Sequence, residues 1–271
     1  MPAADTARSR GFVFPPLIVA LIACAWASLF LWEASPYGRY LNHGDWTAVG
    51  LAGKLCAALP GGQMLLPALL YVGGWLLMSA AMMLPTALPL LAIFARLVAR
   101  RTDGALLQSL VVAGYLLVWA GFGVAAHGLD AVLHLLAGAN PWLRAHGGLV
   151  GAGVLALAGA FQFTALKYHC LDKCRTPFSF VHEHWRGLAP RREAFALGLH
   201  HGVFCVGCCW AIMLLMFVVG VGSVGWMLLL GAVMAMEKNL PWGRSLSAPL
   251  GVGLLLWSGA IVASDMVRWP A

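Results

Sequence analysis

Long apolar segments alternate with short polar ones along the whole chain, and this pattern predicts membrane-spanning helices. Most of the segments are long enough to cross the roughly 30 Å hydrocarbon core of a bilayer. We expect seven spans with these approximate bounds: 12–32, 64–94, 105–126, 147–166, 195–219, 224–238 and 249–267. No linker, internal repeat or low-complexity tract divides the chain. Residues 1–271 are therefore expected to form a single all-α transmembrane domain, a polytopic membrane helix bundle.

The composition supports a membrane protein and limits the kinds of partner that we expect. Hydrophobic residues make up 61% of the chain and charged residues 10%, whereas charged residues are about 25% of a typical soluble domain. The net charge of +7 is typical of some nucleic-acid-binding proteins, but no basic patch interleaved with aromatic residues is present. We therefore expect a lipid bilayer, and no nucleic acid, as the partner.

The distribution of Lys and Arg predicts the orientation of the bundle. Cytoplasmic loops of membrane proteins carry an excess of these residues. Of the 17 Lys and Arg residues, 13 fall in four segments: 1–12, 96–103, 167–192 and 238–244. We therefore predict that the N-terminus is inside, the C-terminus is outside, and residues 167–194 form a cytoplasmic loop. Glu237 and Lys238 end the sixth segment, where their long side chains are expected to reach into the interface.

The strongest chemical signal is a CxxCC motif at Cys205, Cys208 and Cys209, inside the fifth predicted span. Residues three and four apart lie on one face of a helix. Two of these thiolates could therefore bind one soft metal ion. The alternative is that these small polarizable side chains only fill space between helices.

A second motif, HCxxxC, lies in the predicted loop that leads into this helix and comprises His169, Cys170 and Cys174. Two further thiols and an imidazole could complete a metal site if this segment folds back. Thiols on the cytoplasmic side stay reduced, which favours metal binding over disulfides. Cys56 is the only cysteine expected in an outer loop, so no disulfide is predicted.

Methionines extend the possible soft-metal surface. Met78, Met82 and Met83 lie together in the second span, and Met213 and Met216 continue the stripe of Cys205 and Cys209 along the fifth. Thioethers bind Cu(I) weakly enough to release it, as a relay would require. Methionine also fills irregular gaps in packed interiors, and this alternative stays open.

Histidines offer two weaker candidates. His200 and His201 open the fifth span, either as ligands or as interfacial anchors. His127 and His134 share a helical face, with Asp130 between them. They could form an outer site for a metal or a haem, or they could be part of a solvated interfacial surface. The chain contains no phosphate-binding glycine loop, serine-nucleophile elbow or HExxH motif. We therefore do not expect ATP-driven pumping by this chain, and we nominate no catalytic residue and no enzyme activity.

Three segments together resemble a known family: WLLMSAAMMLP, KYHCLDKCRTPFSF and CVGCCWAIMLLM. They are similar to the uncharacterised bacterial family of predicted metal-binding integral membrane proteins, over residues 65–260. The resemblance implies a multi-pass protein of the bacterial inner (plasma) membrane. It nominates the following residues as metal ligands: Met78, Met82, Met83, Cys170, Cys174, Cys205, Cys208 and Cys209.

The leading hypothesis is a membrane protein that binds a soft metal ion through Cys and Met for transport or delivery. Cu(I) is the favoured metal and zinc the alternative. A metal chaperone or another membrane subunit is the expected protein partner. Three rival hypotheses stay open: a membrane thiol-disulfide redox protein, a haem-linked redox protein, and a non-catalytic subunit of a membrane complex.

Overall fold

A computed structural model describes residues 3–34, 65–140, 142, 146–219 and 223–268. Within these ranges every regular element is helical, which confirms the predicted all-α class for the part of the chain described. The elements are α1 (Ala3–Ala34), α3 (Leu65–Leu97), α4 (Gly104–Ala139), α6 (Gly147–Phe161), α7 (Ala165–Arg175), α8 (Pro177–His184), α9 (Pro190–Val219), α10 (Val224–Asn239), the 3-10 turn η3 (Gly243–Leu246) and α11 (Ser247–Arg268). The predicted outer loop with Cys56 lies outside the described residues.

Five of these helices are long and apolar enough to cross a membrane, which indicates a membrane protein. The qualifying segments are Pro16–Ala34, Val72–Leu97, Gly104–Leu133, Pro190–Val218 and Gly243–Asp265. Helices α6 and α7 meet at an angle of 64° and would count as a sixth span if together they form one broken crossing. Helix α10 has 16 residues and so measures about 24 Å, less than a bilayer core. The seven crossings and their direction stay predictions.

The chain is also helical beyond the predicted spans. Helix α4 continues to Ala139, so residues 127–139 prolong the helix of the third predicted span. The predicted loop 167–194 contains helices α7 and α8 and the start of α9. Thr164 caps α7 by accepting a hydrogen bond from the backbone N–H of Lys167 at 3.3 Å, and Pro177 occupies the first turn of α8. Both are favourable helix starts that outweigh the polar composition.

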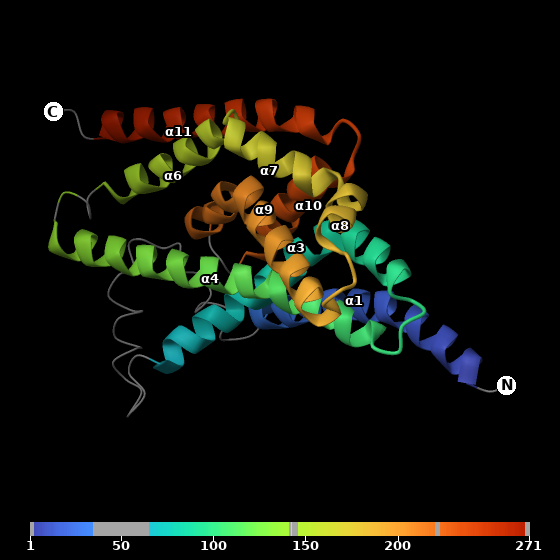
Figure 1. Ribbon diagram of the computed structural model, residues 1–271. Helices are drawn as coiled ribbons and strands as arrows, with labels where there is room; N and C mark the ends of the chain where they lie inside the picture. The colour runs from blue at the N-terminus through green and yellow to red at the C-terminus, as the bar shows by residue number, and fades with distance from the viewer. Residues whose placement is uncertain (1–2, 35–64, 141, 143–145, 220–222, 269–271) are drawn as a thin grey trace.

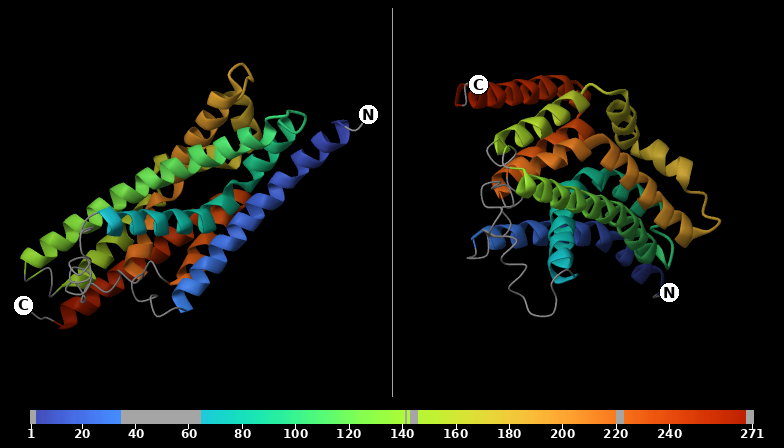
Figure 2. Two further views of the ribbon diagram at one scale, coloured as in Figure 1. Left: turned by 90° about the horizontal axis from the view of Figure 1, so that it is seen from below. Right: turned by 90° about the vertical axis from the view of Figure 1, so that its left-hand side faces the viewer.

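Helix α9 occupies the middle of the bundle and packs against α4, α6, α7, α8 and α10. Figure 1 shows it between α4 and the layer formed by α6 and α11, and the end-on view of Figure 2 shows the same order. The start of α1 and the end of α11 lie at opposite ends of the molecule. The CxxCC motif therefore lies on a helix that five other helices contact.

Helices α4 and α9 approach each other closely at two glycines. A Cβ atom on Gly198 would overlap the carbonyl oxygen of Val111, and one on Gly114 would overlap the carbonyl oxygen of Phe195. Both obstacles are backbone atoms, which cannot rotate away. Small residues of this kind allow membrane helices to pack backbone to backbone.

We expect the substitution Gly198→Ala to separate α4 from α9 and to lower the free energy of unfolding by about 1–3 kcal/mol, as overpacked interiors do. Thermal unfolding of the purified protein in detergent measures this loss. Gly121→Ala is the matched control, because a Cβ at Gly121 on α4 meets no atom within 4 Å. Equal transition temperatures for the two variants would contradict the close packing.

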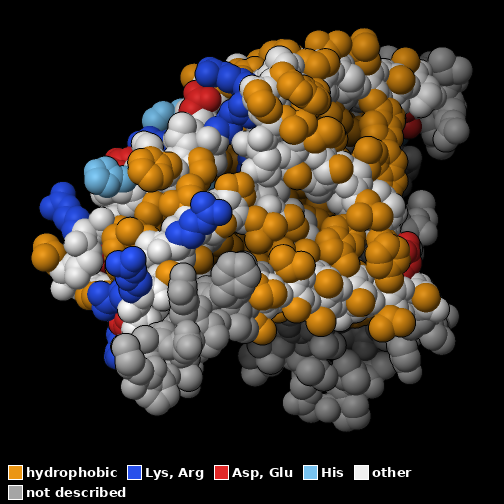
Figure 3. All heavy atoms as spheres, turned by 90° about the vertical axis from the view of Figure 1, so that its right-hand side faces the viewer, with side chains coloured by type: hydrophobic (Ala, Val, Ile, Leu, Met, Phe, Trp, Pro, Cys, Tyr) orange, Lys and Arg blue, Asp and Glu red, His pale blue; other side chains and the backbone are white. Residues whose placement is uncertain are grey.

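Polar and apolar surfaces are separated on the outside of the bundle. Figure 3 shows the Lys, Arg and His side chains of this face gathered on its left, together with some of the Asp and Glu side chains, and mainly hydrophobic side chains over its centre and right. Fully apolar helix faces are exposed, with Leu135 at 74% and Leu256 at 70%. Such surfaces are expected to face lipid.

Candidate metal centre

Five thiols and one thioether meet in the interior, and we call them the sulfur cluster: Cys170 and Cys174 from α7, Cys205, Cys208 and Cys209 from α9, and Met83 from α3. Each of the six is at most 9% exposed. Helix α7 reaches the cluster because α9 carries Gly207 at the crossing, where a Cβ would lie 2.6 Å from Cys170 Sγ. The two predicted cysteine motifs are therefore brought together.

The sulfur atoms lie at separations that suit a shared metal ion. Cys174 Sγ is 4.0 Å from Cys208 Sγ, and Cys209 Sγ is 3.7 Å from Met83 Sδ. Metal–thiolate bonds of about 2.3 Å place two sulfur ligands about 3.8 Å apart in a tetrahedral site and about 4.6 Å apart in a linear one. Within the described residues, no group of three or more His, Cys, Asp and Glu side chains is arranged to hold a metal. The geometry therefore offers pairs of donors.

Without a metal, the thiols are satisfied by the protein itself. The thiols of Cys208 and Cys209 donate to the carbonyl oxygen of Cys205 at 3.1 and 2.8 Å. Such bonds within one helix turn are weak. Little free energy of hydrogen bonding would therefore be lost if a metal ion replaced the thiol protons.

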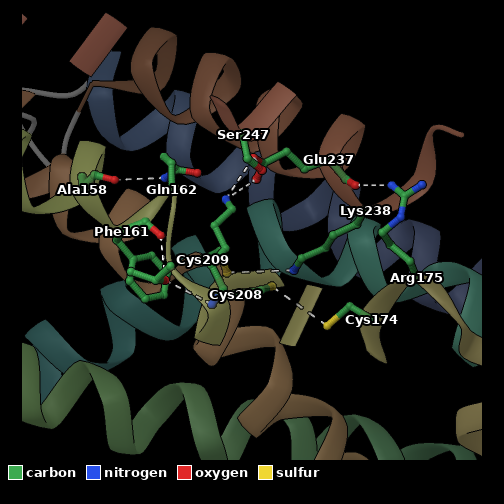
Figure 4. Close-up of polar contacts among 12 residues, drawn as sticks. Ala158, Phe161, Gln162, Cys174, Arg175, Cys208, Cys209, Glu237, Lys238 and Ser247 are labelled. Carbon is green, nitrogen blue, oxygen red and sulfur yellow. Dashed lines mark hydrogen bonds and ion pairs between the residues drawn. The ribbon is translucent and has the colours of Figure 1, made fainter. Parts of the chain in front are cut away.

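One cation lies directly in the cluster. Lys238 on α10 points its ammonium group toward the cysteines of α9 (Figure 4), with Nζ 2.9 Å from Cys205 Sγ and 3.9 Å from Cys209 Sγ. Its Nζ also donates to Thr86 Oγ1 at 3.2 Å. An ammonium group beside sulfur stabilises the thiolate form, which is the form that binds metals.

Tyr115 on α4 closes the cluster on another side. Its hydroxyl lies 3.0 Å from Cys205 Sγ and donates to the carbonyl oxygen of Met83 at 3.2 Å. The same carbonyl accepts a hydrogen bond from Thr86 Oγ1 at 2.8 Å. Tyr115 therefore connects α4 to the backbone of α3 beside Cys205.

The prediction that Glu237 and Lys238 reach into the interface is wrong, because both are buried, at 2% and 6% exposure. Lys167 of α7 donates to both carboxylate oxygens of Glu237 at 2.9 Å, and Ser247 Oγ donates to Glu237 Oε1 at 2.7 Å. Arg175 donates to the backbone oxygen of Glu237. The network connects α7, α10 and α11 (Figure 4). It fixes α10 so that the next residue, Lys238, faces the cysteines.

Lys238 and Tyr115 were missed as neighbours of the site by reasoning from sequence alone. An acidic and a basic residue adjacent to an apolar segment can end a helix at the interface or can be buried together. Ionisable residues inside a membrane domain are by default candidates for function. The two charges beside an apolar segment were therefore the signal that could have identified Lys238. Nothing in the local pattern around Tyr115 indicates that it faces Cys205.

The other predicted ligands are placed as follows. Met78, Met82, Met213 and Met216 are all buried, at 2% exposure or less. Met82 lies against Gly231 of α10, where the methionine carbons would be 3.7–3.9 Å from an added Cβ.

Histidines are distributed over more than one environment. His169 is exposed, with its ring 6.1 Å from that of Phe204, so it stands apart from the buried sulfur atoms. His200 is exposed and His201 is buried, so the two adjacent residues face different surroundings. The side chain of His134 lies outside the described part of the chain.

A buried group of thiols and a thioether in an apolar helical bundle is the kind of donor set that soft metal ions prefer. The comparison with protein families is in agreement: the chain belongs to the PpoB2 copper chaperone family, whose family model matches residues 72–261. This range contains all the residues of the sulfur cluster. It also fits the resemblance to a metal-binding family. No curated protein and no solved structure matches the chain.

Proposed function

We propose that the protein is an integral membrane copper chaperone that carries Cu(I) in the sulfur cluster as its cargo. The observation that supports this most directly is the convergence of cysteines from α7 and α9 with Met83 of α3 in one buried place. In the proposal, Cys174 and Cys208 form one donor pair. Cys205, Cys209 and Met83 form the second group of donors.

The chemistry of the donors favours Cu(I) over other metals. Thiolate and thioether ligands are soft and select Cu(I), whereas hard cations prefer oxygen. Cu(I) accepts as few as two ligands, which agrees with sulfur atoms arranged in pairs. Zinc prefers four closely placed ligands, and the described residues offer no group of three His, Cys, Asp and Glu side chains. Zinc is therefore the less favoured cargo.

Charge balance also supports a monovalent ion. One Cu(I) bound by two thiolates carries a net charge of −1, and an unbalanced charge is costly in a low-dielectric interior. The ammonium group of Lys238, 2.9 Å from Cys205 Sγ, supplies the compensating charge. In this arrangement Cu(I), two thiolates and Lys238 together are neutral.

The apolar helices and the distribution of basic residues support the proposed location. We propose a multi-pass protein of the bacterial inner membrane, with the thiols of α7 toward the cytoplasm, where they stay reduced. The opposite placement of the start of α1 and the end of α11 (Figure 1) supports an odd number of crossings. The copper would pass to or from a metal chaperone or another membrane subunit.

Elemental analysis of protein purified under reducing conditions after copper supplementation tests the proposal. We expect near-stoichiometric copper in the wild type and its loss in the variant Cys205→Ser/Cys208→Ser/Cys209→Ser, because serine oxygen is a poor ligand for soft metals. Cys24→Ser is the matched control, since Cys24 is exposed on α1. Copper-free wild-type protein, or a triple variant that keeps its copper, would refute the proposal.

A further inference from the structure

A pair of imidazoles lies on the surface where α8 meets α9. The ring of His184, near the end of α8, is 4.8 Å from the ring of His200 on α9, between centres. Metal–nitrogen bonds of about 2.0–2.1 Å place the centres of two imidazole ligands about 5 Å apart in a tetrahedral site. His200 is exposed and His184 is half-buried. The pair therefore has both the spacing and the access of a surface metal site.

The hydrogen bond of His184 prepares one ring nitrogen for a metal. Nδ1 of His184 is 2.9 Å from the backbone oxygen of Phe180. A carbonyl oxygen can only accept, so Nδ1 carries the proton and Nε2 keeps a free lone pair. Metal-binding histidines characteristically donate their second ring nitrogen to a carbonyl or carboxylate in this way.

The connection between the two histidines is held rigidly. The carboxylate of Glu193 accepts hydrogen bonds from four consecutive backbone N–H groups, those of residues 186–189, at 2.6–3.0 Å. Gly187 adopts a φ of +75° within this turn, a conformation that glycine takes without strain. The relative position of α8 and α9 at the histidine pair is therefore set before any ligand arrives.

Side chains in mutual contact lead from this pair to the sulfur cluster. Phe180 stacks on His184 at 4.4 Å and meets the edge of the buried His201 at 5.5 Å, both between ring centres. His201 stacks on Tyr115 at 5.7 Å, and the Tyr115 hydroxyl lies 3.0 Å from Cys205 Sγ.

His201 itself has an unsatisfied ring nitrogen at this junction. Its Nδ1 is buried and has no hydrogen-bond partner among the residues that the structure describes. A cavity of about 10 Å³ lies beside it, lined in part by Tyr115 and His201. A buried nitrogen without a partner is uncommon and calls for a role. It lies between the exposed imidazoles and the thiols.

We propose that His184 and His200 form an exposed copper exchange site, through which the ion enters or leaves the sulfur cluster. The inference rests on the proposed copper-carrying function and adds the place of exchange. Imidazole is a good copper ligand, and two ligands leave coordination positions open for the donor or acceptor molecule, as exchange requires.

The test measures how fast apo protein in detergent removes Cu(I) from its coloured bicinchoninate complex. We expect His184→Gln/His200→Gln to slow this transfer by about tenfold or more, because it removes the high local copper concentration that a second site provides. The final copper content should equal that of the wild type. His182→Gln, at an exposed position of the same helix, should load at the wild-type rate.

Each outcome decides the inference. A double variant that loads as fast as the wild type would overturn it, and so would a double variant that also loses copper at equilibrium, because the histidines would then belong to the storage site. Wild-type protein that takes no copper from the complex would refute the proposed function, and the exchange site with it.

Discussion

Replacing Lys238 with leucine is expected to lower the affinity of the protein for Cu(I) by about 10- to 100-fold, the usual cost of removing a group that supports metal ligands. The ammonium group is 2.9 Å from Cys205 Sγ and 3.9 Å from Cys209 Sγ. Without it, a Cu(I) ion bound by two thiolates leaves a net negative charge in the interior, where such a charge is costly. Competition with a Cu(I) chelator of known affinity measures the change.

Met234→Leu is the matched control for Lys238→Leu. Met234 is fully buried one turn earlier on the same helix, so its replacement alters the packing of α10 and leaves the charge in place. We expect its copper affinity to match the wild type. An unchanged or higher affinity in Lys238→Leu would show that the ammonium group repels the metal more than it stabilises the thiolates.

The substitution Glu237→Ala is expected to lower the free energy of unfolding by about 3–5 kcal/mol, as the loss of one partner of a buried ion pair does. The Lys167 side chain is fully buried, with Nζ 2.9 Å from the Glu237 carboxylate. Alanine would leave this ammonium group without a counter-charge, and Ser247 would lose its acceptor. Denaturation of the detergent-solubilised protein by heat or by added SDS measures the loss.

Two further variants separate the effect of charge from that of general disturbance. Lys167→Met/Glu237→Met removes both charges and is expected to restore most of the stability, because apolar replacements of buried pairs are well tolerated. Glu183→Ala removes an exposed ion pair with Lys173 and should leave the transition unchanged. A single variant Glu237→Ala as stable as Glu183→Ala would contradict a structural role for the buried pair.

The chemical nature of the site could be predicted from local sequence, because it depends on helix periodicity. Cys205, Cys208 and Cys209 share a turn of one helix in any fold that keeps α9 helical. Their proximity to Cys170 and Cys174 required only that the neighbouring segment fold back. The structure satisfies this condition through Gly207, which allows α7 to approach α9. Copper, the metal predicted from these donors, agrees with the family match.

The surroundings of the site could not be predicted, because they depend on how distant helices pack. Lys238 is 33 residues from Cys205 and Tyr115 is 90 residues from it. The hydrophobic pattern also did not indicate helices α7 and α8 within the segment 167–194, where helix caps and tertiary contacts outweigh the polar composition. Tertiary contacts also bury Glu237 and Lys238, whose side chains were expected to reach into the membrane interface.

The sulfur cluster draws its donors from α3, α7 and α9, three helices of which α3 is far from the other two in the chain. An ion bound there joins these helices as a cross-link, so the free energy of copper binding is added to that of folding by mass action. An ion present at about 1,000 times its dissociation constant adds about 4 kcal/mol to a fold that binds it only when intact. Under the proposed function, copper affinity and bundle stability are thus two measures of the same equilibrium. We then expect a substitution that loosens the packing of α9 to release copper even when every sulfur atom is retained.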